Sequence, residues 1–545
     1  MYSFIPSWYS GKGNWVKDTK IWHMNGDLME FDDTVNQVKI FQMAGEEVEI
    51  LLLGCMPELR HFLHRERISG VPVWSAFDEI QDIRGNIPRQ IFLKECSWPE
   101  DTEWFYTPFL MTGYRSGELY VKAEFAEDGW WCQATVYKDG QPSQTLHVDD
   151  RGFISYSEVY RNGRPAYRVF YNRRTEWQIL ENLETGKVSV NKTARSRFEK
   201  AAYDCLSEVV EEVLRRHFEG GGEEKLIVAM DAHHDELVRR TAGGRDMVYS
   251  VFTRRNGAAE RELFAVPVNE GRLLVTDTQY LAEKIKGWFP DENLRVMDIS
   301  PYDARLSFGK STTIRALKVL LYADSLDNPE LQSAVKGIFE YMKVNKDVEL
   351  TIGISRHVKE NIPESLFEEL LRMIMKTYEV DYAINEPQKD IAENEVKIER
   401  NPRVFVRKCR TETELIELLS DHRIIVDISP QPDLYLQIAG ISAGVPVVIR
   451  ADSQYVRHRE NGWTLSRNEM NVNEKGKDVV TENERIEDGI SGSRDTSQEI
   501  VQALHYYLDG LANWNKSLIY SLNRITEYTN GNIVGRWKEA MSEVL

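Results

Sequence analysis

The fold is decided by residues 427–450, which read DISPQPDLYLQIAGISAGVPVVIR. The run from Ile424 to Ile428, which is apolar except for Asp427, leads into this stretch and predicts a strand. Leu434 to Ala443 predicts a helix, and Val445 to Ile449 predicts a second buried strand. A strand, a helix and a strand in this order form the repeating unit of a parallel α/β sheet.

The same alternation extends through the rest of the C-terminal half. We expect a helix over Thr312–Leu326 and strands near Val348–Ile354 and Tyr382–Ile384. These elements predict a C-terminal Rossmann-like domain over residues 301–510. Residues 511–545 have helical periodicity with one apolar face, and we expect this segment to pack across domains.

The N-terminal half opens in the same way. Tyr2–Pro6 and Val48–Leu53 predict parallel strands, and Asp32–Gly45 between them predicts a helix. Strand and helix patterns alternate again in the second quarter of the chain. We therefore predict an N-terminal Rossmann-like domain in two parts, residues 1–112 and residues 193–300.

Between these two parts the pattern changes to that of antiparallel strands. From about Tyr114, short β-like runs are separated by residue pairs that favour tight turns, namely Asp128-Gly129, Asp139-Gly140 and Asn162-Gly163. We predict an antiparallel β-sheet insertion over residues 113–192. The fold class is therefore α/β, with two Rossmann-like domains and an all-β insertion in the N-terminal half.

The insertion is rich in aromatic side chains. These side chains could stack on sugar rings, but aromatic residues in such sheets more often fill the core, and we favour packing. The residues concerned are Trp104, Trp130, Trp131, Tyr156, Tyr160, Tyr167 and Tyr171.

Composition excludes several classes of function. The chain has 545 residues, and 42% of them are hydrophobic, which is enough for at least two separate cores. Its 87 acidic and 68 basic residues give a net charge of −19, which disfavours nucleic acid as a partner. The five cysteines are scattered and contain no C-x-x-C pair, so we expect a reducing compartment. No apolar run of 18 residues and no signal-peptide pattern is present, so we expect a cytoplasmic protein without a membrane span.

Residues 440–444, Gly-Ile-Ser-Ala-Gly, match the G-x-S-x-G signature of hydrolases. That signature requires a strand before the serine and a helix after it. Here a helix is expected before the serine and a strand after it, which argues against a hydrolase.

Residues 304–312 nearly match the phosphate-binding loop of ATPases. Ala304 replaces the first glycine of that motif, and its methyl group obstructs the tight backbone cradle that phosphate needs. The sequence therefore argues against an ATPase.

Asp231, His233, His234, Asp235 and Glu236 follow a predicted strand, at the edge of the sheet where α/β proteins bind ligands. Adjacent residues point in different directions, so we favour a solvated loop or a helix N-terminus over a metal site. We expect neither a metal nor a cofactor.

The layout of residues 427–450 resembles the nucleotide-sugar site of GT-B glycosyltransferases. In those enzymes two glutamates, eight positions apart, hold the donor sugar and the ribose. When Pro432 and the run Gly444-Val445-Pro446 are used as anchors, these positions fall on Gln431 and Ala439. A glutamine side chain lacks the negative charge of glutamate, and an alanine side chain cannot form hydrogen bonds at all. The resemblance therefore implies two domains in a GT-B-like arrangement that do not catalyse sugar transfer.

Arg305 and Lys310 resemble the R-x-x-x-x-K pair that neutralises the donor diphosphate in the same enzymes. A solvated loop before a helix is an equally good interpretation. We expect no catalytic residue, and the residues of a vestigial ligand cleft are Arg305, Lys310, Gln431, Ala439 and Gly444.

Three further stretches carry a resemblance that covers nearly all 545 residues: Phe4–Tyr9, Phe31–Gln37 and Val148–Gly152. Together with the altered donor site they resemble the first of the three accessory secretory (Asp) proteins of the streptococcal and staphylococcal accessory Sec system. The resemblance implies a non-catalytic protein that assembles with the second and third accessory secretory proteins. It also implies contact with the accessory motor ATPase, export of a glycosylated serine-rich repeat adhesin, and recruitment to the membrane through the accessory translocon.

Two other functions remain open at this point. The chain could be an active glycosyltransferase that modifies the adhesin with an altered site, which turnover of a nucleotide sugar would establish. It could also be a pseudoenzyme that stabilises a true glycosyltransferase, which co-purification with that enzyme would favour.

Overall fold

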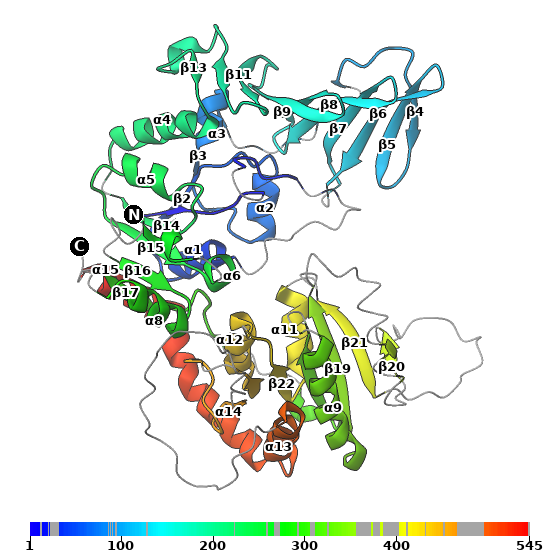
Figure 1. Ribbon diagram of the computed structural model, residues 1–545, viewed down its shortest axis with the longest axis vertical. Helices are drawn as coiled ribbons and strands as arrows, with labels where there is room; N and C mark the ends of the chain where they lie inside the picture. Colours follow the sequence, from blue (N-terminus) through cyan, green and yellow to red (C-terminus); the bar gives the residue numbers. More distant parts are fainter. Residues whose placement is uncertain are drawn as a thin grey trace, which may run out of the picture. The chain divides into compact units, whose positions relative to one another are not determined.

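Seven short apolar strands form the first parallel sheet of the protein, in the computed structural model shown in Figure 1. Their order is β17-β16-β15-β14-β1-β2-β3, and every neighbouring pair is parallel. The strands are β1 (Tyr2–Ile5), β2 (Val48–Leu52), β3 (Val73–Ser75), β14 (Lys225–Ala229), β15 (Met247–Val251), β16 (Leu273–Thr276) and β17 (Arg295–Asp298).

The structure describes most of residues 1–542. The longest stretches outside the described residues are 22–31, 266–272, 306–310, 356–371, 377–381, 385–402 and 466–494, and shorter gaps occur elsewhere. The chain divides into two units, of which unit 1 comprises Met1–Pro301 with Ile533–Leu545, and unit 2 comprises Tyr302–Asn532.

Both faces of the unit 1 sheet are covered by helices. Successive side chains of a strand point to opposite faces, so Phe4 and Ile5 belong to two different core clusters. The helices of this unit are α1 (Asp33–Met43), α2 (Leu59–Arg65), α3 (Ala76–Gln81), α4 (Leu206–Glu219), α5 (Asp235–Thr241), α6 (Thr253–Asn256), α8 (Gln279–Trp288) and α15 (Asn530–Ser542). The expected strand, helix and strand at the start of the chain are thereby confirmed.

Between β3 and β14, unit 1 contains a ten-stranded sheet whose strands all pair antiparallel in sequence order. It runs from Glu103 to Tyr203, a wider span than the predicted 113–192. The strands are β4 (Glu103–Tyr106), β5 (Leu110–Arg115), β6 (Glu118–Phe125), β7 (Trp131–Lys138), β8 (Gln141–Asp149), β9 (Phe153–Arg161), β10 (Arg164–Tyr171), β11 (Trp177–Asn182), β12 (Val188–Val190) and β13 (Ala202–Tyr203).

The turns and aromatic side chains of this sheet follow the sequence predictions. Asp139-Gly140 and Asn162-Gly163 both have positive φ at each residue, which is the conformation that two-residue hairpins require. Trp130, Trp131 and Tyr156 are buried, so packing is confirmed for these three.

Unit 2 contains a second seven-stranded parallel sheet, with the order β20-β21-β19-β18-β22-β23-β24. Its strands are β18 (Leu317–Tyr322), β19 (Val348–Ser355), β20 (Tyr382–Ile384), β21 (Val404–Cys409), β22 (Ile424–Asp427), β23 (Val447–Ile449) and β24 (Gly462–Thr464). Its helices include α9 (Asn328–Val344), α11 (Glu412–Asp421), α12 (Leu434–Ala443), α13 (Thr496–Leu508) and α14 (Ala512–Ile525). The mixed α/β fold with two parallel sheets and one antiparallel sheet is thus confirmed.

The helix expected over Thr312–Leu326 is wrong. The segment holds β18, which pairs with β19 on one side and β22 on the other. A short apolar run fits a buried helix and a buried strand equally well, and here Val319, Leu320 and Leu321 are fully buried between helices on both faces of the sheet.

The helical segment at the end of the chain is broken in two by the short turn Thr526–Tyr528. α15 buries Trp537 against α1 of unit 1. α14 packs on α12 and α13 of unit 2, and it leaves Ile519 60% exposed. The single apolar face expected for this segment therefore does not hold for α14.

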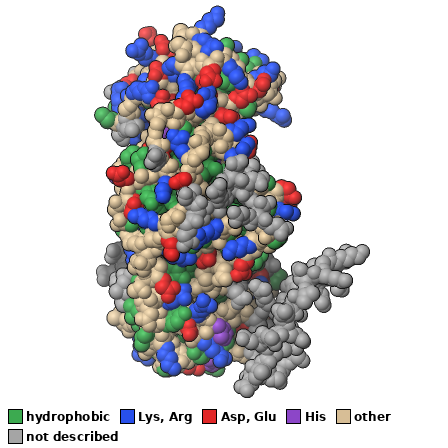
Figure 2. Space-filling model, turned by 90° about the vertical axis from the view of Figure 1, so that its left-hand side faces the viewer, with side chains coloured by type: hydrophobic (Ala, Val, Ile, Leu, Met, Phe, Trp, Pro, Cys, Tyr) green, Lys and Arg blue, Asp and Glu red, His purple; other side chains and the backbone are tan. Residues whose placement is uncertain are grey.

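Charged side chains of both signs lie on the face of the protein drawn in Figure 2. On the face drawn in Figure 2, acidic and basic side chains are interspersed, so the net charge of −19 is not gathered into one patch there. In the described part of the chain, the helices are too short or too polar to cross a membrane.

Candidate functional site

The loop between β22 and α12 is the segment in which the sequence predicts a donor site. The carboxylate of Asp427 accepts hydrogen bonds from the backbone N and the Oγ of Ser429, at 3.2 and 2.6 Å, and from the backbone N of Asp433, at 2.6 Å. Asp427 is fully buried, and burial raises its pKa to about 7 against the effect of these hydrogen bonds. This carboxyl fixes the loop from which α12 begins, with Asp433 as the N-cap.

The glycines of α12 have packing roles. A Cβ on Gly440 would lie 2.6 Å from Cγ2 of Val447, so only glycine lets the helix approach β23 this closely. Gly444 ends the helix with φ of 67°, a conformation that side chains disfavour. Ser442 donates to the carbonyl O of Ile438 at 3.0 Å, and the strand follows the helix. The order expected from sequence is confirmed, and it does not form a hydrolase elbow.

Of the five predicted site residues, the structure describes Ala439, Gly444 and Arg305. Gln431 and Lys310 lie outside the described residues. Ala439 is half-buried near the middle of the helix, and Gly444 ends it.

Arg305 lies far from the donor loop. Its backbone N donates to Oγ of Ser442 at 3.2 Å, and its exposed guanidinium pairs with Asp303 at 2.6 Å. Ser442 is nine residues from the N-cap Asp433, or about 14 Å along a helix. The structure therefore brings the Arg305 backbone to the opposite end of α12 from the loop.

A second group of polar side chains lies at the carboxyl ends of β1 and β14. The order of the unit 1 sheet reverses between these two strands, which is where open α/β sheets bind ligands. Ser7 donates to Asp231 across this point. His234 contacts Tyr9 Oη at 2.8 Å through Nδ1 and the carbonyl O of Ala229 at 2.9 Å through Nε2.

Because both ring nitrogens of His234 have partners within the protein, this histidine is structural. It is fully buried, and burial lowers its pKa to about 4. The expected helix N-terminus is confirmed, since α5 begins at Asp235, but the expectation of solvation is wrong for His234 and Asp235. Among the described residues, no three His, Cys, Asp or Glu side chains converge as metal ligands.

Beside this group, Arg255 forms two hydrogen bonds to the carboxylate of Asp33, at 2.7 and 2.9 Å. Asp33 also lines a hollow with Gln37, Ser250 and Asp277 that has no room even for a water molecule. Pockets for small molecules usually measure several hundred Å³. The hollow is therefore too small to serve as a ligand site.

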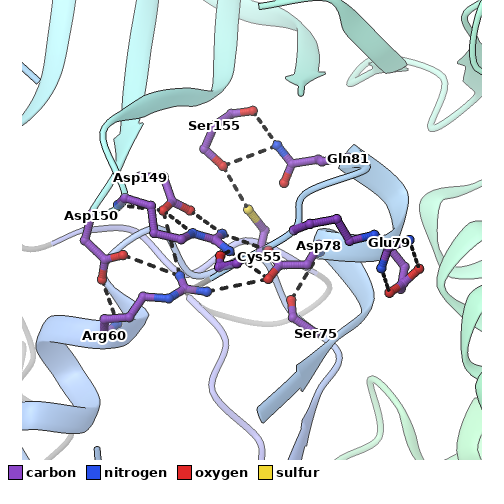
Figure 3. A network of polar contacts seen from close by, with 12 residues as sticks. Cys55, Arg60, Ser75, Asp78, Glu79, Gln81, Asp149, Asp150 and Ser155 are labelled. Atoms are coloured by element: carbon purple, nitrogen blue, oxygen red, sulfur yellow. Dashed lines mark hydrogen bonds and ion pairs between the residues drawn. The ribbon is translucent and has the colours of Figure 1, made fainter. Parts of the chain in front are cut away.

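A charged network joins the antiparallel sheet to the parallel sheet of unit 1. Arg151, in the turn between β8 and β9, forms two hydrogen bonds of 2.8 Å to Asp78 of α3 and bonds of 2.7 and 2.8 Å to Asp149. Asp150 accepts from the backbone N of Arg60 on α2 at 2.6 Å. Figure 3 shows Asp78, Asp149 and Asp150 arranged around the guanidinium of Arg60.

The structural role of this turn was not predicted from the sequence. Asp149, Asp150 and Arg151 are all buried, and three adjacent charged residues within a strand-turn-strand segment were the available signal. The same turn requires a glycine at position 152, because a Cβ on Gly152 would lie 2.7 Å from the carbonyl O of Arg89.

The buried carboxyl of Asp427 gives the protein a measurable pH dependence. An acid whose pKa is higher in the folded protein than in the unfolded chain keeps its proton in the folded state between pH 4 and pH 7. Its contribution to stability is therefore largest below pH 4 and is lost as the pH rises through 7. We expect the free energy of unfolding to fall by about 2–3 kcal/mol between pH 5 and pH 8 from this group.

Urea unfolding of the protein and of Asp427→Asn over this pH range measures the effect. The amide cannot titrate, so the variant is less stable at pH 5 but has a flatter pH profile. Parallel profiles for the two proteins would show that Asp427 remains charged when buried.

Comparison with known proteins places the chain in a family. The family model of the first accessory secretory protein (Asp) of the accessory Sec system matches residues 1–483 and 484–544. The corresponding protein of Streptococcus gordonii is 32% identical over 556 aligned residues, which cover 100% of this chain and 99% of the relative.

Solved structures agree with this match. A chain in the crystal structure of accessory secretory proteins 1, 2 and 3 of Streptococcus pneumoniae is 26% identical with a TM-score of 0.79, covering 100% of this chain and 99% of that one. The pneumococcal O-GlcNAc transferase GtfA, solved with UDP and GlcNAc, has a TM-score of 0.69 at 10% identity, with the same coverage, and this likeness is one of fold alone. The chain belongs to the family of the first accessory secretory protein of the accessory Sec system.

Proposed function

We propose that the chain is a non-catalytic, GT-B-like component of the accessory Sec system. The observation that carries the proposal is α12, which keeps the packing glycine and helix caps of its fold but presents the methyl group of Ala439 where a donor-binding carboxylate is expected. A methyl group can neither accept nor donate a hydrogen bond to a sugar or ribose hydroxyl.

We also propose how the chain is divided into domains. Residues 1–112 and 193–300 would form one Rossmann-like domain, residues 301–510 the other, and the antiparallel sheet would be an insertion in the first. The two parallel sheets and the fold likeness to GtfA support a GT-B-like arrangement of these domains.

We further propose that the protein acts in the cytoplasm, assembling with the second and third accessory secretory proteins. Membership of the family supports this, as does the pneumococcal structure, which holds accessory secretory proteins 1, 2 and 3 together. The complex would engage the accessory motor ATPase and deliver a glycosylated serine-rich repeat adhesin for export. Recruitment to the membrane would follow from contact with the accessory translocon.

Two experiments test this function. The first is co-purification of the second and third accessory secretory proteins when all three are expressed together, and we expect a stable complex. The second is release of UDP from UDP-GlcNAc in the presence of an unglycosylated serine-rich peptide, with GtfA as the positive control. We expect UDP release no higher than that of a sample without protein.

The outcomes separate the alternatives. UDP release above background would make the chain an active glycosyltransferase. Co-purification with a glycosyltransferase in place of the accessory proteins would make it a pseudoenzyme partner of that enzyme.

A further inference from the structure

β4 is an outer strand of the antiparallel sheet (Figure 1). Within the described residues it has one neighbour, β5, and its other side is an open edge. β13, at the opposite end of the sheet, is only two residues long, Ala202–Tyr203, and offers little to pair with. β4 is the edge of this sheet that can accept another strand.

The hydrogen-bond pattern shows which backbone groups face the open edge. The backbone N of Thr107 donates to the carbonyl O of Leu110 at 3.0 Å, so these residues form a hydrogen-bonded pair. Hydrogen-bonded and non-hydrogen-bonded pairs alternate along an antiparallel ladder. Phe105 therefore directs its backbone groups to β5, while Trp104 and Tyr106 direct their N–H and C=O groups outward.

The side chains of β4 do not protect this edge. Phe105 is 56% exposed and Tyr106 is 71% exposed, while Trp104 is half-buried against Trp98, with ring centroids 5.8 Å apart. Natural sheets usually block such edges with lysine, proline or a bulge, because an exposed apolar edge pairs readily with another chain. The four residues of β4 include none of these features, and their one charged residue is Glu103.

We propose that β4 is a docking edge, which receives an extended segment of another protein as an additional antiparallel strand. Main-chain hydrogen bonds to Trp104 and Tyr106 would hold the segment, as in other cases of strand addition. The aromatic side chains favour apolar or β-branched residues at alternate positions of the segment. Glu103, which is exposed at the start of β4, favours a lysine or arginine at the C-terminal end of the segment.

A second copy of this chain fits the edge less well. Antiparallel pairing of two β4 strands must join the outward groups of Trp104 and Tyr106. In the registers that do so, Glu103 faces Thr107, Phe105 or Phe109 of the other copy and never a cation. A four-residue edge also buries far less than the roughly 800 Å² per partner of a stable dimer. Charge and area both favour a segment of a different protein.

Fluorescence anisotropy with a labelled peptide tests the proposal. The probe is a seven-residue peptide of alternating valine and threonine that ends in lysine. We expect a Kd on the order of 0.1–1 mM, as befits a few hydrogen bonds and apolar contacts. A peptide with proline at its centre should bind at least about tenfold more weakly, because it lacks a central N–H.

Two variants locate the binding at β4. Tyr106→Pro removes an outward N–H without removing a bond to β5, and we expect at least about tenfold weaker binding. Glu103→Lys should reverse the preference, so that a peptide ending in glutamate binds better than the one ending in lysine. Trp177→Ala is the matched control, because it removes an exposed aromatic residue from an inner strand of the same sheet and should leave binding unchanged.

Circular dichroism establishes that each variant folds as the parent does. No binding of the lysine peptide up to several times the expected Kd, or equal binding of the proline peptide, would overturn the proposal. Concentration-dependent dimerisation that Tyr106→Pro abolishes would overturn it too, since the occupant would then be a second copy.

Discussion

Replacing Arg151 by methionine is expected to lower the free energy of unfolding by about 3–5 kcal/mol, the range found when one partner of a buried ion pair is removed. The side chain of Arg151 is 2% exposed, and it supplies hydrogen bonds to both Asp78 and Asp149. Methionine fills a similar volume but removes these hydrogen bonds, so that Arg60, 3.5 Å from Asp78 and 3.8 Å from Asp149, is the cation that remains. The antiparallel sheet is then held less firmly to α3, where Gln81 still donates to the carbonyl O of Ser155 on β9.

Urea unfolding followed by tryptophan fluorescence measures the loss. Arg84→Met is the matched control, because Arg84 pairs with Glu79 of the same helix at 2.6 Å but is 69% exposed. An exposed pair of this kind contributes under about 1 kcal/mol. If Arg151→Met costs no more than Arg84→Met, the network does not stabilise the junction.

Trp537→Ala is expected to have a comparable effect, about 3–5 kcal/mol, because a large buried aromatic side chain is lost and a cavity remains. Trp537 is 1% exposed and belongs to the core between α15 and the sheet of unit 1. Its ring lies 6.0 Å from that of Phe41 on α1. Thermal unfolding and hydrogen exchange of the α1 amides should both report the change.

Ile519→Ala is the control for this substitution. One apolar face was expected over residues 511–545, but Ile519 is 60% exposed on α14 and should contribute within about 0.5 kcal/mol. Equal destabilisation by the two substitutions would mean that the exposed surface of α14 is covered by another part of the protein.

The elements predicted most accurately from sequence are those whose signal is local. α12 was expected at Leu434–Ala443 and has these bounds, because its ends are set by Asp433 as N-cap and Gly444 as C-cap. β18 was mistaken for a helix, since its few apolar residues fit either period. Its true state depends on β19 and β22, which lie far away in the sequence.

The same distinction applies to the candidate site. Ala439 could be placed from the spacing of neighbouring proline and glycine residues, because the motif lies within one helix and its flanks. The position of Arg305 could not, because its contact with Ser442 joins residues 137 positions apart. The pairing of Arg151 with Asp78 across 73 positions was hidden for the same reason.

The return of α15 to unit 1 affects how the protein is made. α1 emerges from the ribosome early, but the helix whose Trp537 packs against Phe41 follows roughly 500 residues later. At translation rates of about 5–20 residues per second, the part of α1 that α15 covers waits about 25–100 s for it. The nascent chain therefore carries an exposed apolar surface through most of its synthesis, and chaperones that bind such surfaces have time to act on it.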